Sequence, residues 1–295
     1  MEIGLVLPHT GPSASATFIR DFAQAAEEHE FSRLWAVDHL VLPFQVTSLY
    51  VLGREPSPIA DGWLSDNLAP NYEMMTTLAW VAGQTTTIGL GTSIAVLPLR
   101  NPVANARQLA TLDALSGGRL TYGVGVGWLR EEAIAMGVPW DRRGARAEEH
   151  IALLRTLWCA SDPYVEFHGK FYDFAPMDPR PQPVQRPVPI LVGGHSDRAI
   201  DRAARVGDGW IAAPMSVNRL TELVTKLRRA AELHGRSQDS LYTVASTRYS
   251  DTPSFAETCS AVRRLGIDHL QVVIPDGEPS LVIDRVREIA ALAGQ

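Results

Sequence analysis

The sequence predicts a single α/β domain with the TIM (β/α)8 barrel fold. Apolar segments of strand length alternate with amphipathic segments of helical period along the whole chain, and the alternation repeats eight times. Within residues 87–128 the pattern is strand, loop, helix, strand, with glycines gathered at one end, where a parallel β/α protein keeps its chemistry. A chain of 295 residues could form two domains, but single barrels commonly reach this length. A doubly wound open sheet is the alternative, although it rarely needs eight regular units.

The first half of the chain contains four strands, each followed by helical pattern. Residues 41–71 are too irregular for one element and are predicted to be an insertion at the end of the second strand, a kind of long loop that is often functional. Pro102 stands at the first position of a helix, where its missing N–H costs nothing. The predicted strands are residues 3–7, 33–40, 87–96 and 120–126, and the predicted helices are 17–29, 72–83, 102–115 and an interrupted pattern within 131–159.

The second half begins with another insertion and then resumes the alternation. Residues 161–189 are rich in proline and aromatic residues, and the stretch FHGKFYDF is typical of a small hairpin. Both insertions are expected to shape a substrate pocket. The remaining strands are residues 189–192, 209–213, 241–247 and 269–274, and the remaining helices are 197–206, 217–234, 254–265 and 280–292.

Composition excludes several classes of function. A net charge of −6 and a pI near 5.8 argue against broad binding to nucleic acid or to an anionic membrane surface. The two cysteines, Cys159 and Cys259, lack the spacing of metal ligands, and the amino terminus leads directly into a strand. No segment approaches the roughly 20 apolar residues of a membrane span, so a cytoplasmic protein without a metal site is expected. The motifs of zinc proteases, P-loop NTPases and α/β-hydrolases are not found in the sequence.

Asp38 and His39 close the second predicted strand. Because side chains alternate along a strand, one of the two is expected to face the barrel mouth and the other the barrel wall. A histidine there could donate or accept a proton near neutral pH. The alternative is a capping aspartate beside a surface histidine.

Two glycine-rich strand ends could bind a ligand. Gly123, Gly125 and Gly127 alternate with valine, so one face is bare and could either receive a planar ring or allow close backbone packing. In the sequence LVGGHSDRA, Gly193, Gly194, His195 and Ser196 lie between a strand and a helix, where exposed N–H groups can bind phosphate. A simple turn capped by Ser196 or Asp197 fits that segment equally well.

Three further groups have weaker signals. Thr92, Ser93 and Ile94 on the third strand could reach a cofactor edge or break the strand in a bulge. Asp208 is expected to shape a turn. Solvated helix faces are expected for most of the arginines near the candidate loops, namely Arg100, Arg107, Arg119, Arg130 and Arg142.

The segments LWAVDHLVLP, LGTSIAVLPLRNPVANARQLATLDALSGGRLTYGVGVGWLREE and PILVGGHSDRAIDRAARVGDGWI together resemble the luciferase-like monooxygenase superfamily. Within it, the Asp-His pair is most similar to the branch of oxidoreductases that depend on the deazaflavin coenzyme F420. The resemblance implies a barrel with insertions that binds the cofactor ring at its carboxyl-terminal mouth. It implies that the reactive face of the ring lies by Asp38 and His39. A bulge at Thr92, Ser93 and Ile94, often with a non-proline cis peptide, would lie behind the ring. Gly125 and Gly127 would leave room for the ring, and Gly193, Gly194 and Ser196 would hold the phosphate.

One position departs from the pattern of the F420-dependent sugar-phosphate dehydrogenases. Those enzymes have an acidic residue after the glycine-rich strand, whereas this chain has Trp128. A more apolar pocket with Trp63 and Trp128 as walls is therefore expected. We expect hydride transfer between F420 and a small organic substrate, with His39 as the proton donor or acceptor, in a homodimer.

Two other functions remain open from the sequence. The first is a monooxygenase that uses oxygen and reduced FMN delivered by a separate reductase. The second is a non-catalytic flavin-binding protein, which would need no titrating group at the ring.

Overall fold

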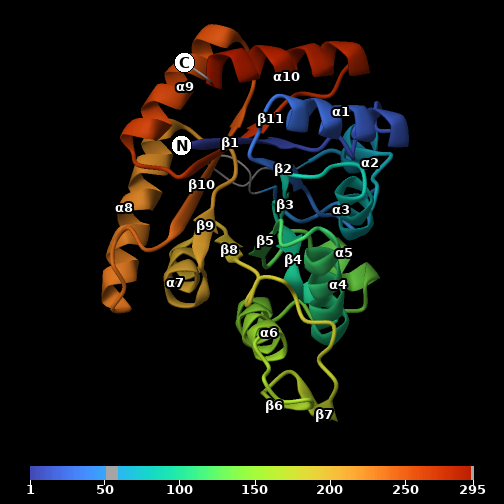
Figure 1. Cartoon of the computed structure of the whole chain (residues 1–295), viewed down its shortest axis with the longest axis vertical. Helices are drawn as coiled ribbons and strands as arrows, with labels where there is room; N and C mark the ends of the chain where they lie inside the picture. Colours follow the sequence, from blue (N-terminus) through green and yellow to red (C-terminus); the bar gives the residue numbers. More distant parts are fainter. Residues whose placement is uncertain (51–58, 294–295) are drawn as a thin grey trace.

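The computed structural model describes residues 1–50 and 59–293 and shows a closed barrel of eight parallel strand positions surrounded by helices (Figure 1). The barrel closes because β1 pairs with both its sequence neighbour β2 and the last strand, β11. The predicted fold class is thereby confirmed. The strands in order are β1 (Glu2–Val6), β2 (Arg33–Ala36), β3 (Gly89–Thr92), its continuation β4 (Ala95–Val96), β5 (Leu120–Gly125), β8 (Ile190–Gly193), β9 (Gly209–Ile211), β10 (Tyr242–Arg248) and β11 (His269–Val273).

Helices cover the outside of the barrel, and short polar residues define where several of them begin. The side chains of Ser15, Asn101, Ser196, Ser216 and Asp251 each accept a hydrogen bond from a backbone N–H of the first helical turn. The helices are α1 (Ala16–Glu28), α2 (Trp63–Leu68), α3 (Met74–Ala82), the 3-10 turn η1 (Leu97–Leu99), α4 (Pro102–Leu115), α5 (Arg130–Ala135), α6 (Arg143–Trp158), α7 (Asp197–Val206), α8 (Val217–Leu233), α9 (Thr252–Arg264) and α10 (Pro279–Ala293). Among the described residues, no helix combines the length and the apolar character needed to cross a membrane.

Two predicted strands differ from the observed ones. The second strand ends at Ala36, so Asp38 and His39 lie in a loop and the alternation of strand side chains does not apply to them. The third strand is broken between β3 and β4 by a cis peptide bond between Ser93 and Ile94. The predicted bulge is therefore confirmed, whereas the extension of the second strand to residue 40 was wrong.

The lower part of the barrel interior is filled by Trp35. Its indole Nε1 donates a hydrogen bond to Nε2 of His269 across the barrel at 3.0 Å. Glycines on neighbouring strands make room for the indole, because a Cβ on Gly91 would lie 2.4 Å from a ring carbon and one on Gly4 2.9 Å from Nε1. The interior above Trp35, toward the carboxyl-terminal ends of the strands, is therefore where a ligand would enter the barrel.

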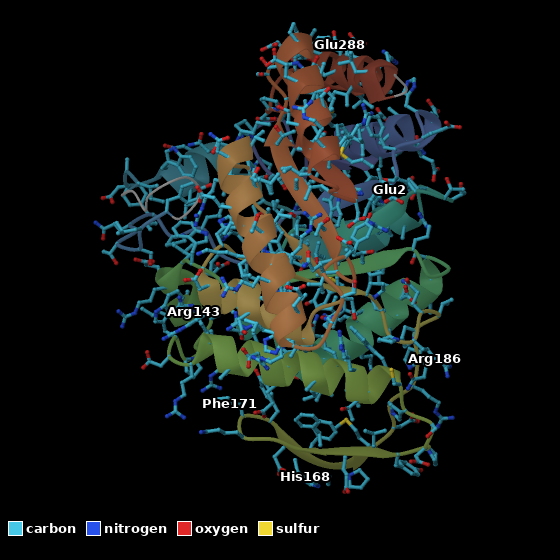
Figure 2. The ribbon with its side chains drawn as sticks, turned by 90° about the vertical axis from the view of Figure 1, so that its left-hand side faces the viewer. Glu2, Arg143, His168, Phe171, Arg186 and Glu288 are labelled. Carbon is cyan, nitrogen blue, oxygen red and sulfur yellow. The ribbon has the colours of Figure 1, made fainter. Side chains whose placement is uncertain are left out.

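The two insertions lie at different places on the barrel. The second forms the hairpin of β6 (Val165–His168) and β7 (Asp173–Met177) along the outer side of α6, where the carboxylate of Glu149 accepts three backbone N–H groups from residues 170–172 (Figures 1 and 2). Further on, Gln185 donates to the carbonyl of Leu120 at the beginning of β5. The expectation that this insertion shapes the pocket was wrong, because its anchors are on the outer surface and at the opposite end of the strand from the mouth.

Candidate active site

The first insertion is fastened to the carboxyl-terminal mouth. The carboxylate of Glu131, at the start of α5, accepts hydrogen bonds from the backbone and hydroxyl groups of Thr47 and Ser48 at 2.6–3.0 Å. Burial alone would raise the pKa of Glu131, but these hydrogen bonds outweigh it and lower the pKa to about 2. The described part of residues 41–71 is thus held over the end of β5.

Asp38 joins the loop after β2 to the loop after β4. Its carboxylate accepts hydrogen bonds from the backbone N–H of Val96 at 2.8 Å and from Nη2 of Arg100 at 2.9 Å, and the residue is 6% exposed. Burial raises the pKa of Asp38, while the Arg100 guanidinium and the Val96 N–H oppose that rise. Arg100 is itself buried, with 8% of its side chain exposed, so its expected place on a solvated face was wrong.

His39 is held by a carboxylate that sequence reasoning missed. Nδ1 of His39 lies 3.2 Å from Oε2 of Glu132, whose side chain is 2% exposed, against 17% for His39. The other oxygen of Glu132 accepts the backbone N–H groups of Leu40 and Val41. Because a carboxylate accepts the proton on Nδ1, Nε2 is the atom left to exchange a proton with a ligand. The only sequence signal for Glu132 was an acidic residue soon after the glycine-rich strand.

Aromatic side chains form a cluster beside His39. The ring of Trp128 meets the His39 imidazole edge to face, with centroids 6.2 Å apart. Tyr50 lies between the two predicted wall residues, at 5.0 Å from Trp128 and 5.8 Å from Trp63. Burial raises the pKa of Tyr50, and the nearby guanidinium of Arg248 at the end of β10 opposes this rise. The structure therefore brings Trp63 and Trp128 together through Tyr50, which the sequence had not indicated.

The bare glycine face of β5 is filled by the bulge of the third strand. A Cβ on Gly123 would lie 2.0 Å from the carbonyl oxygen of Thr92, and one on Gly125 2.0 Å from Cδ1 of Ile94. The hydroxyl of Thr92 also donates to the carbonyl of Gly123 at 2.6 Å. Of the two interpretations of this face, close backbone packing is the one observed. The room predicted at Gly125 is occupied by Ile94.

Gly127, just beyond β5, is a separate case. Its φ of +77° is strained for a residue with a side chain, and a Cβ there would lie 2.8 Å from Cγ1 of Val96. Gly127 therefore turns the chain sharply so that Trp128 enters the aromatic cluster.

The segment from Gly193 to Ser196 joins the end of β8 to the amino-terminal end of α7. The hydroxyl of Ser196 accepts a hydrogen bond from the N–H of Ala199 at 3.2 Å. Ser196 therefore caps the helix, which was one of the two interpretations of this segment. Gly194, at φ +121°, lies so close to the helix that a Cβ would be 2.7 Å from Cβ of Ala199. A side chain at Gly194 would thus collide with the methyl group of Ala199, so glycine lets the chain turn tightly into the amino-terminal end of α7, where free N–H groups suit an anion.

His195 does not add a positive charge to this junction. Its Nε2 accepts the backbone N–H of Ala213 at 3.1 Å, so that nitrogen carries no proton. Burial is the main cause that lowers the pKa of His195, and the Arg219 guanidinium lowers it further. Any phosphate held here would depend on backbone N–H groups, because the nearby Arg219 is paired with Glu222 at 2.7 Å.

Asp208, in contrast, lies at the beginning of β9. Its carboxylate accepts the backbone N–H of Ile190 at 2.8 Å and pairs with Arg155 at 2.9 Å. The structural role predicted for Asp208 is confirmed.

Comparison with known proteins identifies the family. Residues 1–273 match the family model of the luciferase-like monooxygenases. The chain belongs to the luciferase-like monooxygenase family. A curated relative is an uncharacterised protein of Mycobacterium tuberculosis, 35% identical over 221 residues that cover 75% of this chain and 74% of the relative.

Two relatives and one solved structure have named activities. An F420-dependent glucose-6-phosphate dehydrogenase of Kineococcus radiotolerans is 33% identical over 225 residues, 75% of this chain and 60% of that enzyme. An FMNH2-dependent dimethylsulfone monooxygenase of Pseudomonas putida is 38% identical over 141 residues, 46% of this chain and 38% of that enzyme. Among solved structures, an F420-dependent secondary alcohol dehydrogenase has a TM-score of 0.81 with 17% identity, covering 99% of this chain and 98% of its own. At that identity the structure supports the fold alone.

Proposed function

We propose that this protein is an F420-dependent oxidoreductase that transfers a hydride between the deazaflavin and a small organic substrate. The observation that carries the proposal is the His39–Glu132 pair at the barrel mouth, with Nε2 of the imidazole available for proton exchange. The relative that depends on F420 and aligns over three quarters of the chain supports the choice of cofactor.

The residues at the mouth fit a tricyclic cofactor with a phosphate-bearing chain. The ring would lie between His39 and the bulge at Ser93 and Ile94, and the phosphate would bind at Gly194 and Ser196, at the amino-terminal end of α7. When bound, the deazaflavin would supply or accept the hydride.

The side chains of this chain would handle the proton. In its neutral form His39 donates Nδ1–H to Glu132 and offers the lone pair of Nε2 to a substrate hydroxyl that is being oxidised. The buried carboxylate of Glu132 stabilises the resulting imidazolium. In the opposite direction the imidazolium returns that proton. Asp38, through Arg100 and Val96, holds the loop in place, and does not contact the reacting atoms.

The walls of the pocket favour an apolar substrate. Trp128 stands where the sugar-phosphate dehydrogenases have an acidic residue, and Tyr50 and Trp63 extend its ring surface, so a sugar phosphate would lose a polar contact. A small alcohol or ketone with an apolar body suits these walls better.

A second candidate function is an FMN-dependent monooxygenase that receives reduced FMN from a separate reductase. The sulfone monooxygenase of Pseudomonas putida favours it, but its alignment covers less than half of this chain. A non-catalytic flavin-binding protein has the least support, because such a protein does not need a histidine held by a buried carboxylate. We also propose a homodimer, which light scattering of the purified protein would test.

Titration of the purified protein with F420 and with FMN, followed by fluorescence quenching, tests the choice of cofactor. We expect F420 to bind more tightly than FMN; tight binding of FMN without binding of F420 would overturn the proposal. His39→Ala should bind F420 as the wild type does and lose most of the turnover, and full activity in that variant would exclude His39 from proton transfer.

A further inference from the structure

A polar cluster lies inside the upper barrel, where the other described inward-facing side chains are largely apolar. It consists of Ser93 at the bulge, Ser246 on β10 and Gln271 on β11. The hydroxyl of Ser93 donates to Oε1 of Gln271 at 2.8 Å, and that of Ser246 donates to the same oxygen at 3.1 Å. The neighbouring apolar cluster is formed by Trp35, Leu191, Ile211 and Val244.

The Gln271 amide accepts both serine hydroxyls at one oxygen. A carbonyl oxygen has two lone pairs, and with both of them used the NH2 group is left as the donor. Gln271 is 2% exposed, and its amide nitrogen has no hydrogen-bond partner among residues 1–50 and 59–293. That nitrogen is not one of the fully buried side-chain atoms that lack a partner, so it keeps a small accessible surface through which the NH2 group can donate to a ligand.

The register of β11 places this amide at the mouth side of the barrel. His269, two residues earlier on the same face of the strand, closes the floor with Trp35. Gln271 pairs in register with Ser246 of β10, and its side chain reaches Ser93 on the bulge. The amide nitrogen therefore lies one layer above the floor, beside the bulge that would support a cofactor ring.

We propose that Gln271 recognises the cofactor ring, with Nε2 donating a hydrogen bond to a carbonyl oxygen of the pyrimidinedione end of the tricycle. The inference rests on the proposed function, and it names a residue that neither a motif nor a strand-end position had indicated. Both F420 and FMN carry this carbonyl-bearing ring, so the proposal holds for either cofactor. Ser93 and Ser246 are positioning residues, because they hold the amide through Oε1 and do not themselves reach the ring.

The test compares cofactor affinity in Gln271→Leu and Gln271→Glu with that of the wild type, for F420 and FMN separately. Leucine removes the donor at similar volume, and glutamate keeps the shape while replacing the NH2 group by an acceptor oxygen. Gln238→Leu, at an exposed glutamine before β10, is the matched control. Dissociation constants from fluorescence quenching and the absorption maximum of the bound oxidised cofactor are measured, with circular dichroism to check folding.

We expect Gln271→Leu to weaken the binding of the preferred cofactor roughly fivefold to tenfold, the loss expected for one neutral hydrogen bond, and to shift its absorption maximum. Gln271→Glu should weaken it further, and Ser246→Ala only about twofold to threefold. The control should bind as the wild type does. If Gln271→Leu does not fold, the near-isosteric glutamate variant decides.

Two other results are distinguishable. If the wild type binds a coenzyme and a folded Gln271 variant keeps its affinity and spectrum, the role of Gln271 is refuted while the proposed function stands. If the wild type binds neither F420 nor FMN, the proposed function fails and the role of Gln271 fails with it.

Discussion

Replacement of Glu132 by glutamine removes the negative charge beside His39 while keeping the size of the side chain. The amide oxygen can still accept the N–H groups of Leu40 and Val41, so the loop after β2 keeps its anchor. The variant loses the charge-assisted hydrogen bond between the Glu132 carboxylate, which is 2% exposed, and Nδ1 of His39 at 3.2 Å.

The size of the effect follows from that geometry. A hydrogen bond to a charged group contributes about 1.5–3 kcal/mol, and its full value is needed only when the imidazolium forms. Because each 1.36 kcal/mol is a factor of ten in rate, Glu132→Gln should lower kcat roughly 10-fold to 150-fold. KM should change little, since Glu132 does not line the aromatic walls.

A double-mutant cycle separates this role from a structural one. In the background of His39→Ala, the change Glu132→Gln should cost almost nothing further, because its partner is already gone. Steady-state kinetics of the four proteins with the preferred cofactor provide the measurement, with Glu257→Gln, at an exposed position on α9, as control. Equal losses of kcat from Glu132→Gln in both backgrounds would refute the reasoning.

The remaining predictions concern stability and are checked by thermal unfolding. Glu131→Gln should lower Tm at pH 7, because the pKa of Glu131 is lowered to about 2 in the folded protein. The carboxylate therefore stabilises the fold above the unfolded pKa of 4.5, and this stabilisation fades as the pH falls from 4.5 to about 2. The Tm difference between the variant and the wild type should disappear over that range, and a constant difference would contradict the prediction. Gly123→Ala should lower Tm because its Cβ would lie 2.0 Å from the backbone carbonyl oxygen of Thr92, whereas Gly125→Ala would meet only the movable Cδ1 of Ile94 and should cost less; an equal or larger loss from Gly125→Ala would contradict this. Asp38→Ala leaves Arg100 buried without its close partner and should destabilise by about 3–5 kcal/mol, more than Asp38→Asn; a neutral effect would show that the pair is not needed for stability.

Features that are encoded locally were predictable from the sequence. The helices Pro102–Leu115 and Asp197–Val206 begin and end where the pattern placed them, because their capping residues, Asn101 and Ser196, act within one turn. The eight-fold alternation was sufficient for the barrel, since strand pairing in a closed parallel sheet follows chain order.

Features that depend on contacts between distant residues were not predictable. Glu132 meets His39 across 93 positions of sequence, and Arg100 is buried because Asp38, 62 positions earlier, folds against it. The glycines of β5 looked like a surface for a ring because nothing local shows that Ile94 occupies the space. Such contacts depend on how the loops fold over the barrel, and the hydrophobic periodicity of the sequence carries no information about that.

In the segment after β5, one residue sets the polarity of the pocket and another supplies the carboxylate partner of His39. Trp128 lies in the aromatic cluster and its ring is perpendicular to the imidazole of His39, whereas Glu132, in the first turn of α5, binds Nδ1 of the same imidazole. An acidic residue near a helix amino terminus is favoured by the helix dipole, so the carboxylate is stable where it is. The tryptophan therefore makes the pocket less polar without depriving His39 of its carboxylate, and the departure at position 128 bears on substrate choice more than on proton transfer.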